Sequence, residues 1–219
     1  MKAMFSVGTV AACVMLGALP ASATTIDIGV STGGNITTEA TGSGTSGAGL
    51  ALLPYDGFLI TVAASDPNPV DLGSASLNVS GGSKSPLYVY VTETGLVSNG
   101  SALSFQSQFS AGVPSGWSET ETTYVSASNL AYGEGVELGS MTGSGTTSVT
   151  KGGVNVGAAG STFSITEVYE FISDGLGLDA SAESIQAAPA PAIGTGIPSL
   201  LAVGAMLLGT KLLGRWRRS

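Results

Sequence analysis

The sequence predicts an all-β protein, an antiparallel β-sandwich or jelly-roll-like ectodomain followed by a single C-terminal transmembrane helix. Short runs of alternating apolar and polar residues fill the middle of the chain, and Gly and Pro punctuate them at turn-like intervals. One long apolar run precedes a basic C-terminal tail. The chain has 219 residues, of which 33 are Gly and 10% are charged. A body of about 160 residues is ample for one core.

The first 23 residues have the layout of a secretory signal peptide. Lys2 supplies the positive charge near its start, residues 3–19 are apolar, and Pro-Ala-Ser-Ala ends in a small-x-small cleavage site. We therefore expect cleavage between Ala23 and Thr24. The single cysteine, Cys13, lies inside the apolar run, so the mature chain has none. This fits an exported protein that uses no disulfide or thiol chemistry. A first transmembrane helix is the alternative, but no basic stop follows the run.

Period-two runs rich in β-branched and aromatic residues predict strands in the body, residues 24–185. In one run Leu87, Val89 and Val91 alternate with Tyr88, Tyr90 and Thr92, and in another Glu167 interrupts the apolar face. The predicted strands are 58–63, 75–79, 87–92, 103–109, 119–125 and 162–172.

The segments between these runs are predicted as turns and loops. Asn99-Gly100 between two alternating runs is a hairpin signal. The Gly/Thr-rich stretches 37–49 and 139–153 are predicted as long loops.

Composition excludes several kinds of chemistry. The chain has no His, so it has no Ser-His-Asp triad and no His-ligated zinc. A formal net charge of −8 argues against nucleic acid as a partner. The carboxylate pairs spaced for glycoside hydrolysis are Glu119 with Glu121, Glu134 with Glu137, and Glu167 with Glu170. Nearly any acidic β-protein offers such a pair and nothing beyond the pairing supports catalysis, so we favour a solvated acidic face and predict that the protein is not an enzyme and needs no cofactor.

Two features are candidates for binding. Asp66-Pro-Asn-Pro-Val-Asp71 clusters oxygen ligands as calcium loops do, although Asp, Asn and Pro also favour a plain turn. The flat rings of Trp117, Tyr124 or Tyr132 are candidates for stacking on sugars, against the alternative that the core takes them.

The C-terminal end has three parts, a Pro/Ala/Gly spacer at 186–196, a transmembrane helix at 197–214 and a basic tail at 215–219. The apolar run of the helix spans about 25 Å at about 1.5 Å per residue, close to a bilayer core. All 15 acidic residues lie between Asp27 and Glu183, whereas the basic residues gather in the tail. This asymmetry predicts an exported body and a cytoplasmic membrane stop. The stop residues are Lys211, Arg215, Arg217 and Arg218.

This three-part layout resembles the PEP-CTERM sorting signals of exported bacterial proteins, which exosortase-type enzymes handle. The matching motif is Ala188, Pro189, Ala190 and Pro191, with Ala190 in the place of the family's Glu. The resemblance implies a bacterial cell-surface or matrix protein that is at least transiently anchored in the membrane. Its expected partners are the membrane, signal peptidase and an exosortase-like enzyme. An ordinary linker before a permanent anchor is the alternative.

The sequence therefore predicts a non-enzymatic, structural or adhesive surface or matrix protein. A second copy of the chain or extracellular polysaccharide is its expected outer partner. A secreted polysaccharide- or calcium-binding module is the alternative function.

Overall fold

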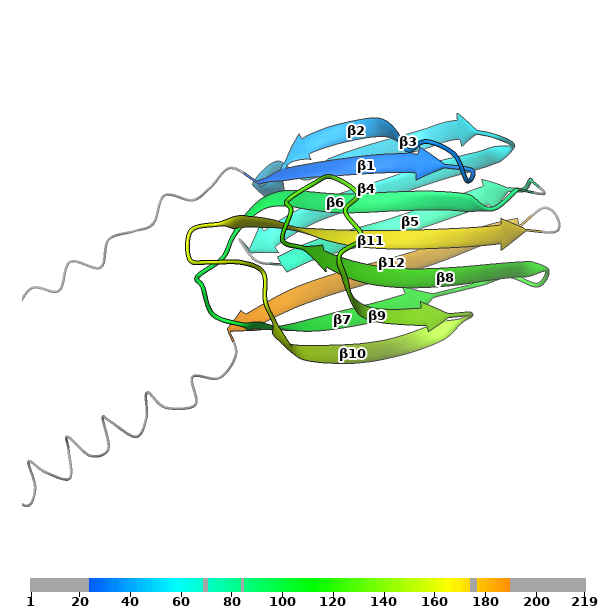
Figure 1. The fold of residues 1–219 in the computed structure, drawn as a ribbon. Coiled ribbons are helices and arrows are strands. Elements are labelled where there is room, and N and C mark those ends of the chain that lie inside the picture. The colour runs from blue at the N-terminus through cyan, green and yellow to red at the C-terminus, as the bar shows by residue number, and fades with distance from the viewer. Residues whose placement is uncertain (1–23, 69–70, 84, 174–176, 190–219) are drawn as a thin grey trace, which may run out of the picture.

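The computed structural model describes residues 24–68, 71–83, 85–173 and 177–189, which form two antiparallel six-stranded sheets packed face to face (Figure 1). Sheet A has the order β2 (Thr37–Ser43), β1 (Thr25–Ser31), β6 (Leu87–Val97), β11 (Thr162–Ser173), β8 (Trp117–Ser126) and β9 (Val136–Thr142). Sheet B has the order β10 (Gly145–Val154), β7 (Leu103–Ala111), β12 (Gly177–Pro189), β5 (Asp71–Gly81), β4 (Phe58–Asn68) and β3 (Ala48–Tyr55). The predicted antiparallel β-sandwich is confirmed.

The chain crosses from one sheet to the other at both long edges of the sandwich. Edge strand β2 continues through a 3-10 turn, η1 (Gly44–Ser46), into edge strand β3 of sheet B. At the opposite edge β9 turns directly into β10, and Lys151 Nζ on β10 donates to the carbonyl oxygen of Glu137 on β9 at 2.5 Å. Each edge strand is thus tied to the opposite sheet, one of the ways in which proteins manage exposed edges.

The six predicted strands are present, most of them longer than predicted. The alternation at 103–109 becomes β7, with Leu103, Phe105 and Phe109 buried and the glutamines between them exposed. The run 58–63 grows into β4, which pairs along its length with β5. The other four predicted runs lie in β5, β6, β8 and β11.

The two predicted loops are wrong. The stretch 37–49 contains β2 and the start of β3, and the stretch 139–153 contains most of β9 and β10. These are edge strands, which bury few apolar side chains, so their sequences lack a clear alternation. The hairpin predicted at Asn99-Gly100 is also wrong, because β6 and β7 belong to different sheets and the turn crosses between them.

The inner faces of the two sheets supply one apolar core. Phe105 of β7 meets Phe163 of β11 edge to face, with 6.4 Å between ring centroids, and so joins sheet B to sheet A. Trp117 packs edge to face on Phe58 at 6.2 Å. Burying a side chain of this size stabilises the fold by about 1.5–3 kcal/mol.

Strand β1 begins and strand β12 ends at the same end of the sandwich (Figure 1). Strand β12 runs through Pro189, which pairs with Leu103, so residues 186–189 of the predicted spacer belong to sheet B. No helix in the described part of the chain has the length and apolar character that crossing a membrane requires. The predicted signal peptide 1–23 and helix 197–214 lie outside the described residues.

Candidate functional site

The outer face of sheet A gathers tyrosines and carboxylates from its central strands. Antiparallel partners share a face of their sheet, so the register sets the neighbours. Glu170 of β11 lies between Tyr88 of β6 and Thr120 of β8, and in the next row Val168 lies between Tyr90 and Thr122. A third row joins Thr92, Thr166 and Tyr124. We call this surface the tyrosine face; it comprises Tyr88, Tyr90, Tyr124, Tyr132, Glu134, Glu137 and Glu170.

Tyr88 and Glu170 form a hydrogen-bonded pair across two strands. The Tyr88 hydroxyl donates to Glu170 Oε1 at 2.8 Å. This hydrogen bond raises the pKa of Tyr88 above its ordinary value, and burial and the negative charge of Glu170 add to the effect. The pair therefore holds a neutral phenol and a carboxylate in fixed relative positions on a half-buried surface.

Tyr90 is the buried member of the face and supports the rings on either side. It packs on Tyr88 in a tilted arrangement at 6.5 Å and on Tyr132 edge to face at 5.8 Å. Burial is the main cause of its raised pKa, followed by the negative charge of Glu134. The three rings thus form a continuous aromatic strip from β6 toward β1.

The loop between β8 and β9, residues 127–135, folds back over sheet A; we call it the strap. Asn129 Oδ1 accepts the backbone N–H of Gly95 at 2.7 Å, and the N–H of Tyr132 donates to Thr92 Oγ1 at 3.1 Å. The Ser164 hydroxyl donates to the carbonyl oxygen of Leu130 at 3.0 Å. These bonds fix the strap to both β6 and β11.

Tyr132 anchors the strap on the first two strands. Its hydroxyl donates to Thr38 Oγ1 of β2 at 2.8 Å, and its ring lies over Gly29 of β1. The backbone φ of Tyr132 is 59°, and that of Asn129 is 53°. Residues other than Gly rarely adopt this left-handed region. Such strain persists only where the surroundings enforce it.

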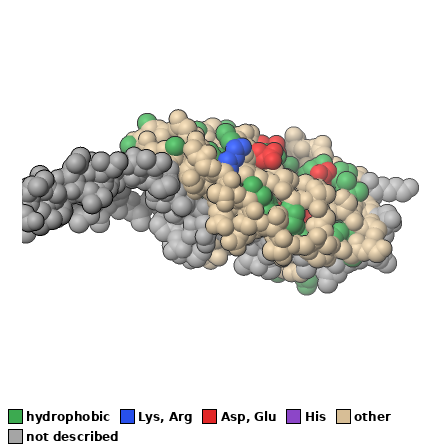
Figure 2. All heavy atoms as spheres, turned by 90° about the horizontal axis from the view of Figure 1, so that it is seen from below, with side chains coloured by type: hydrophobic (Ala, Val, Ile, Leu, Met, Phe, Trp, Pro, Cys, Tyr) green, Lys and Arg blue, Asp and Glu red, His purple; other side chains and the backbone are tan. Residues whose placement is uncertain are grey.

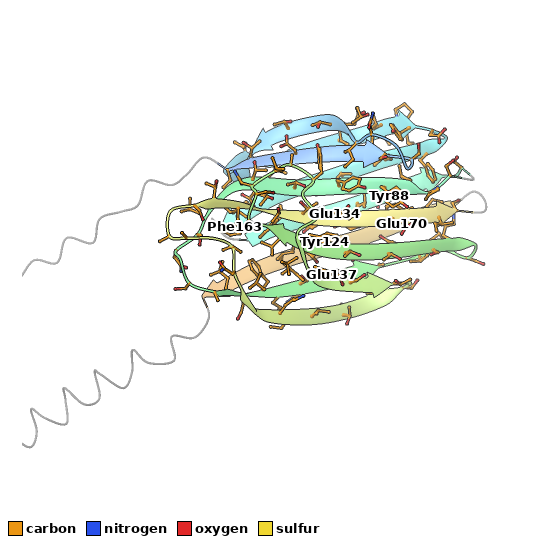
Figure 3. The ribbon with its side chains drawn as sticks, in the orientation of Figure 1. Tyr88, Tyr124, Glu134, Glu137, Phe163 and Glu170 are labelled. Atoms are coloured by element: carbon orange, nitrogen blue, oxygen red, sulfur yellow. The ribbon has the colours of Figure 1, made fainter. Side chains whose placement is uncertain are left out.

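Three carboxylates border the rings, as Figure 3 shows for Glu134, Glu137 and Glu170 beside Tyr88 and Tyr124. Glu134 and Glu137 are exposed, whereas Glu170 is half-buried. Burial raises the pKa of Tyr124, and the charges of Glu134 and Glu137 raise it further. Since a phenolate is disfavoured beside carboxylates, these rings stay neutral hydrogen-bonding groups at physiological pH.

The predicted aromatic residues divide between this face and the core. Tyr124 and Tyr132 lie on the tyrosine face, whereas Trp117 is 9% exposed and packs in the core against Phe58. The sequence interpretation missed Tyr88 and Tyr90 as site residues. Their signal was present, because the alternation placed both on the face opposite Leu87, Val89 and Val91.

The solvated-face interpretation is wrong for Glu119, Glu121 and Glu167. Glu119 and Glu121 are 1% and 0% exposed, because they share the inner face of β8 with Trp117. Glu167 is likewise buried, and the Tyr169 hydroxyl donates to its Oε2 at 3.3 Å. With Glu93, these residues place four carboxyl groups between the sheets.

The structure describes only some of the remaining predicted site residues. Asp66 is buried at the end of β4, and Asn68 pairs with Asp71 in the hairpin between β4 and β5. Across the described ranges, no group of three or more Asp, Glu, Cys or His is arranged to hold a metal ion. Ala188 and Pro189 of the sorting motif lie in β12. Outside the described residues lie Ala23, Ala190, Pro191, Lys211, Arg215, Arg217 and Arg218.

No family model and no curated protein matches this chain. Among solved structures, it is similar to TmCBM61, solved in complex with β-1,4-galactotriose, at 9% identity and a TM-score of 0.33 over 64% of this chain and 99% of that one. It is also similar to the enzymatically active domain of bacteriophage CBA120 tailspike protein 4, at 14% identity and a TM-score of 0.32 over 59% of this chain and 18% of that one. At these scores neither likeness assigns a ligand or an activity to this chain.

Proposed function

We propose that this chain is an exported, non-enzymatic surface or matrix protein that adheres to polysaccharide through the tyrosine face. The observation that carries the proposal is the Tyr88–Glu170 pair, which holds an aromatic ring and a carboxylate side by side on the outer face of sheet A. Tyr124 and Glu134 repeat this combination two strands away.

This combination suits a sugar ring. The C–H groups of a pyranose pack on the flat face of an aromatic ring, while its hydroxyls donate to carboxylate oxygens. Tyr88, Tyr124 and Tyr132 are all half-buried, so each ring is supported from below and still partly accessible. Because the strap and the strand ladders hold these groups in place, little side-chain entropy is lost on binding.

The placement of the chain ends supports a tethered protein. Strand β1 begins and strand β12 ends at one end of the sandwich, whereas Tyr88 and Glu170 lie toward the other end (Figures 1 and 3). An anchor formed by the predicted helix 197–214 would therefore leave Tyr88 and Glu170 at the end of the sandwich away from the membrane. Self-association of the chain is a separate prediction from the sequence, and this proposal does not depend on it.

Binding of oligosaccharides to the full chain, purified in detergent, tests the function. We expect hexasaccharides to bind the native chain and Tyr124→Ala to weaken that binding about tenfold or more, as loss of a central aromatic contact does. Gln108→Ala, on the outer face of sheet B, is the control and leaves the affinity unchanged. Equal affinity of native and Tyr124→Ala chains, with equal melting temperatures, would contradict the proposal.

The intact mass of the protein from its native host tests export and sorting separately. A species from Thr24 to a residue between Pro189 and Pro191 supports removal of both end signals, and would leave β12 in sheet B intact. A species ending at Ser219 would make the apolar segment a permanent anchor and contradict the sorting proposal.

A further inference from the structure

The tyrosine face carries negative charge on every side of its rings. Glu134 lies close enough to both Tyr90 and Tyr124 for its charge to raise the pKa of each. Glu170 accepts a hydrogen bond from Tyr88, and the charges of Asp27 and Glu39 raise the pKa of Tyr132. With Glu137 beside Tyr124, five carboxylates therefore lie near four phenol rings.

Positive charge that would offset these carboxylates is scarce in the described part of the chain. Lys151 is the one Lys or Arg among the residues in those ranges, and its ammonium group donates to the carbonyl oxygen of Glu137 at the β9 border of the face, so one positive charge stands against five carboxylates. Seen from below, the molecule shows few charged side chains, and its surface is mainly backbone and side chains that are neither charged nor hydrophobic (Figure 2). The carboxylates of the face thus set its local potential.

This potential separates polysaccharides by charge. A uronic acid or a sulfated sugar would bring a second anion within a few ångströms of Glu134 or Glu170, which is repulsive. A sugar amine brings an ammonium group, which is attracted to carboxylates and also to the faces of aromatic rings within about 6 Å. The ring of the same sugar can still pack on a tyrosine.

We propose that the tyrosine face selects polysaccharides with free amino groups, such as polymers of glucosamine, over their N-acetylated and anionic counterparts. This inference rests on the proposed function, since it names the class of sugar that the face binds. Glu134 and Glu137 lie beside Tyr124, whereas Glu170 lies beside Tyr88. Ammonium groups of different sugar units therefore meet these two sets of carboxylates, and the sugar rings run along Tyr88 and Tyr124.

The test compares three probes on the full chain: the hexamers of glucosamine, N-acetylglucosamine and galacturonic acid. In low salt we expect the affinity for the glucosamine hexamer to exceed that for the N-acetylated hexamer by about tenfold or more. We expect the galacturonic acid hexamer not to bind. Glu134→Gln lowers this preference severalfold. Asp56→Asn removes the same charge from the β3–β4 turn, outside the tyrosine face, and leaves the preference unchanged.

Three outcomes overturn the inference, and they are distinct from one another. If the N-acetylated hexamer binds as tightly as the amine, the selection is absent while the proposed function stands. If Tyr124→Ala, which keeps every charge, binds the glucosamine hexamer as tightly as the native chain, the attraction is bulk charge alone. Failure of all three hexamers to bind would count against the amine preference and the proposed function together.

Discussion

The ring of Tyr132 lies directly over the backbone of Gly29, so close that a methyl group at position 29 would come within 2.8 Å of Tyr132 Cζ. This contact joins the strap to the second strand of sheet A. It explains why β1 has a glycine in its middle, where a side chain would ordinarily add stability.

Gly29→Ala should therefore destabilise the protein by about 1–3 kcal/mol, because the added methyl overlaps both Tyr132 and Ile36. Chemical denaturation measures the change. Gly34→Ala is the matched control: a methyl there meets nothing within 4 Å, and we expect a change below about 0.5 kcal/mol. Similar losses for the two variants would mean that Tyr132 does not occupy this position.

Phe163→Ala should cost about 3–5 kcal/mol of unfolding free energy, because Phe163 is fully buried and joins the two sheets through Phe105. Its exposed neighbour Thr162 is the control, and Thr162→Ala should change stability by less than about 0.5 kcal/mol. A cost below about 1 kcal/mol for Phe163→Ala would contradict the face-to-face packing of the sheets.

Stability should fall in alkaline solution. Four tyrosines of the face have pKa values raised above the ordinary 10.0, so the folded state holds their protons more tightly than the unfolded state. Their contribution to stability is fully present below about pH 10 and is lost as pH rises through the folded-state values. Urea unfolding between pH 8 and pH 11.5 measures the loss.

Tyr88→Phe removes the hydroxyl whose pKa Glu170 raises, so the variant should lose less stability than the native chain over the same interval. A native stability that stays level or rises above pH 10 would be inconsistent with the raised values.

Carbodiimide labelling should distinguish the two environments of the glutamates. Glu134 and Glu137 are exposed and should react in the folded protein, whereas Glu93, Glu119, Glu121 and Glu167 should react only after unfolding. Peptide mass spectrometry gives the rate at each residue. Labelling of Glu121 as fast as Glu137 in the folded chain would show that the inner face of β8 is open to water.

The central strands were predictable because their side chains alternate between a buried face and an exposed face. Leu103, Phe105 and Phe109 mark β7 in this way, and Ile26, Ile28 and Val30 carried the same signal for β1, which the interpretation did not use. Edge strands β2 and β10 were not predictable, since their small polar residues suit an exposed strand and a loop equally well.

The candidate site was predictable only in its parts. Spacing places Glu119 and Glu121 on one face of a strand, but it does not say which face meets the other sheet. Tyr132 reaches the site through the strap, whose path depends on hydrogen bonds to Thr92 and Gly95, far from it in the sequence. Such contacts leave no periodic pattern.

The affinity of the full chain for the glucosamine hexamer, measured for the native protein and for Tyr124→Ala, tests the account most directly. If the tyrosine face binds the sugar, the native chain binds the hexamer measurably, and Tyr124→Ala lowers the affinity about tenfold or more, with both chains melting at the same temperature. Equal affinity of two equally stable chains, or no binding by the native chain, would contradict it.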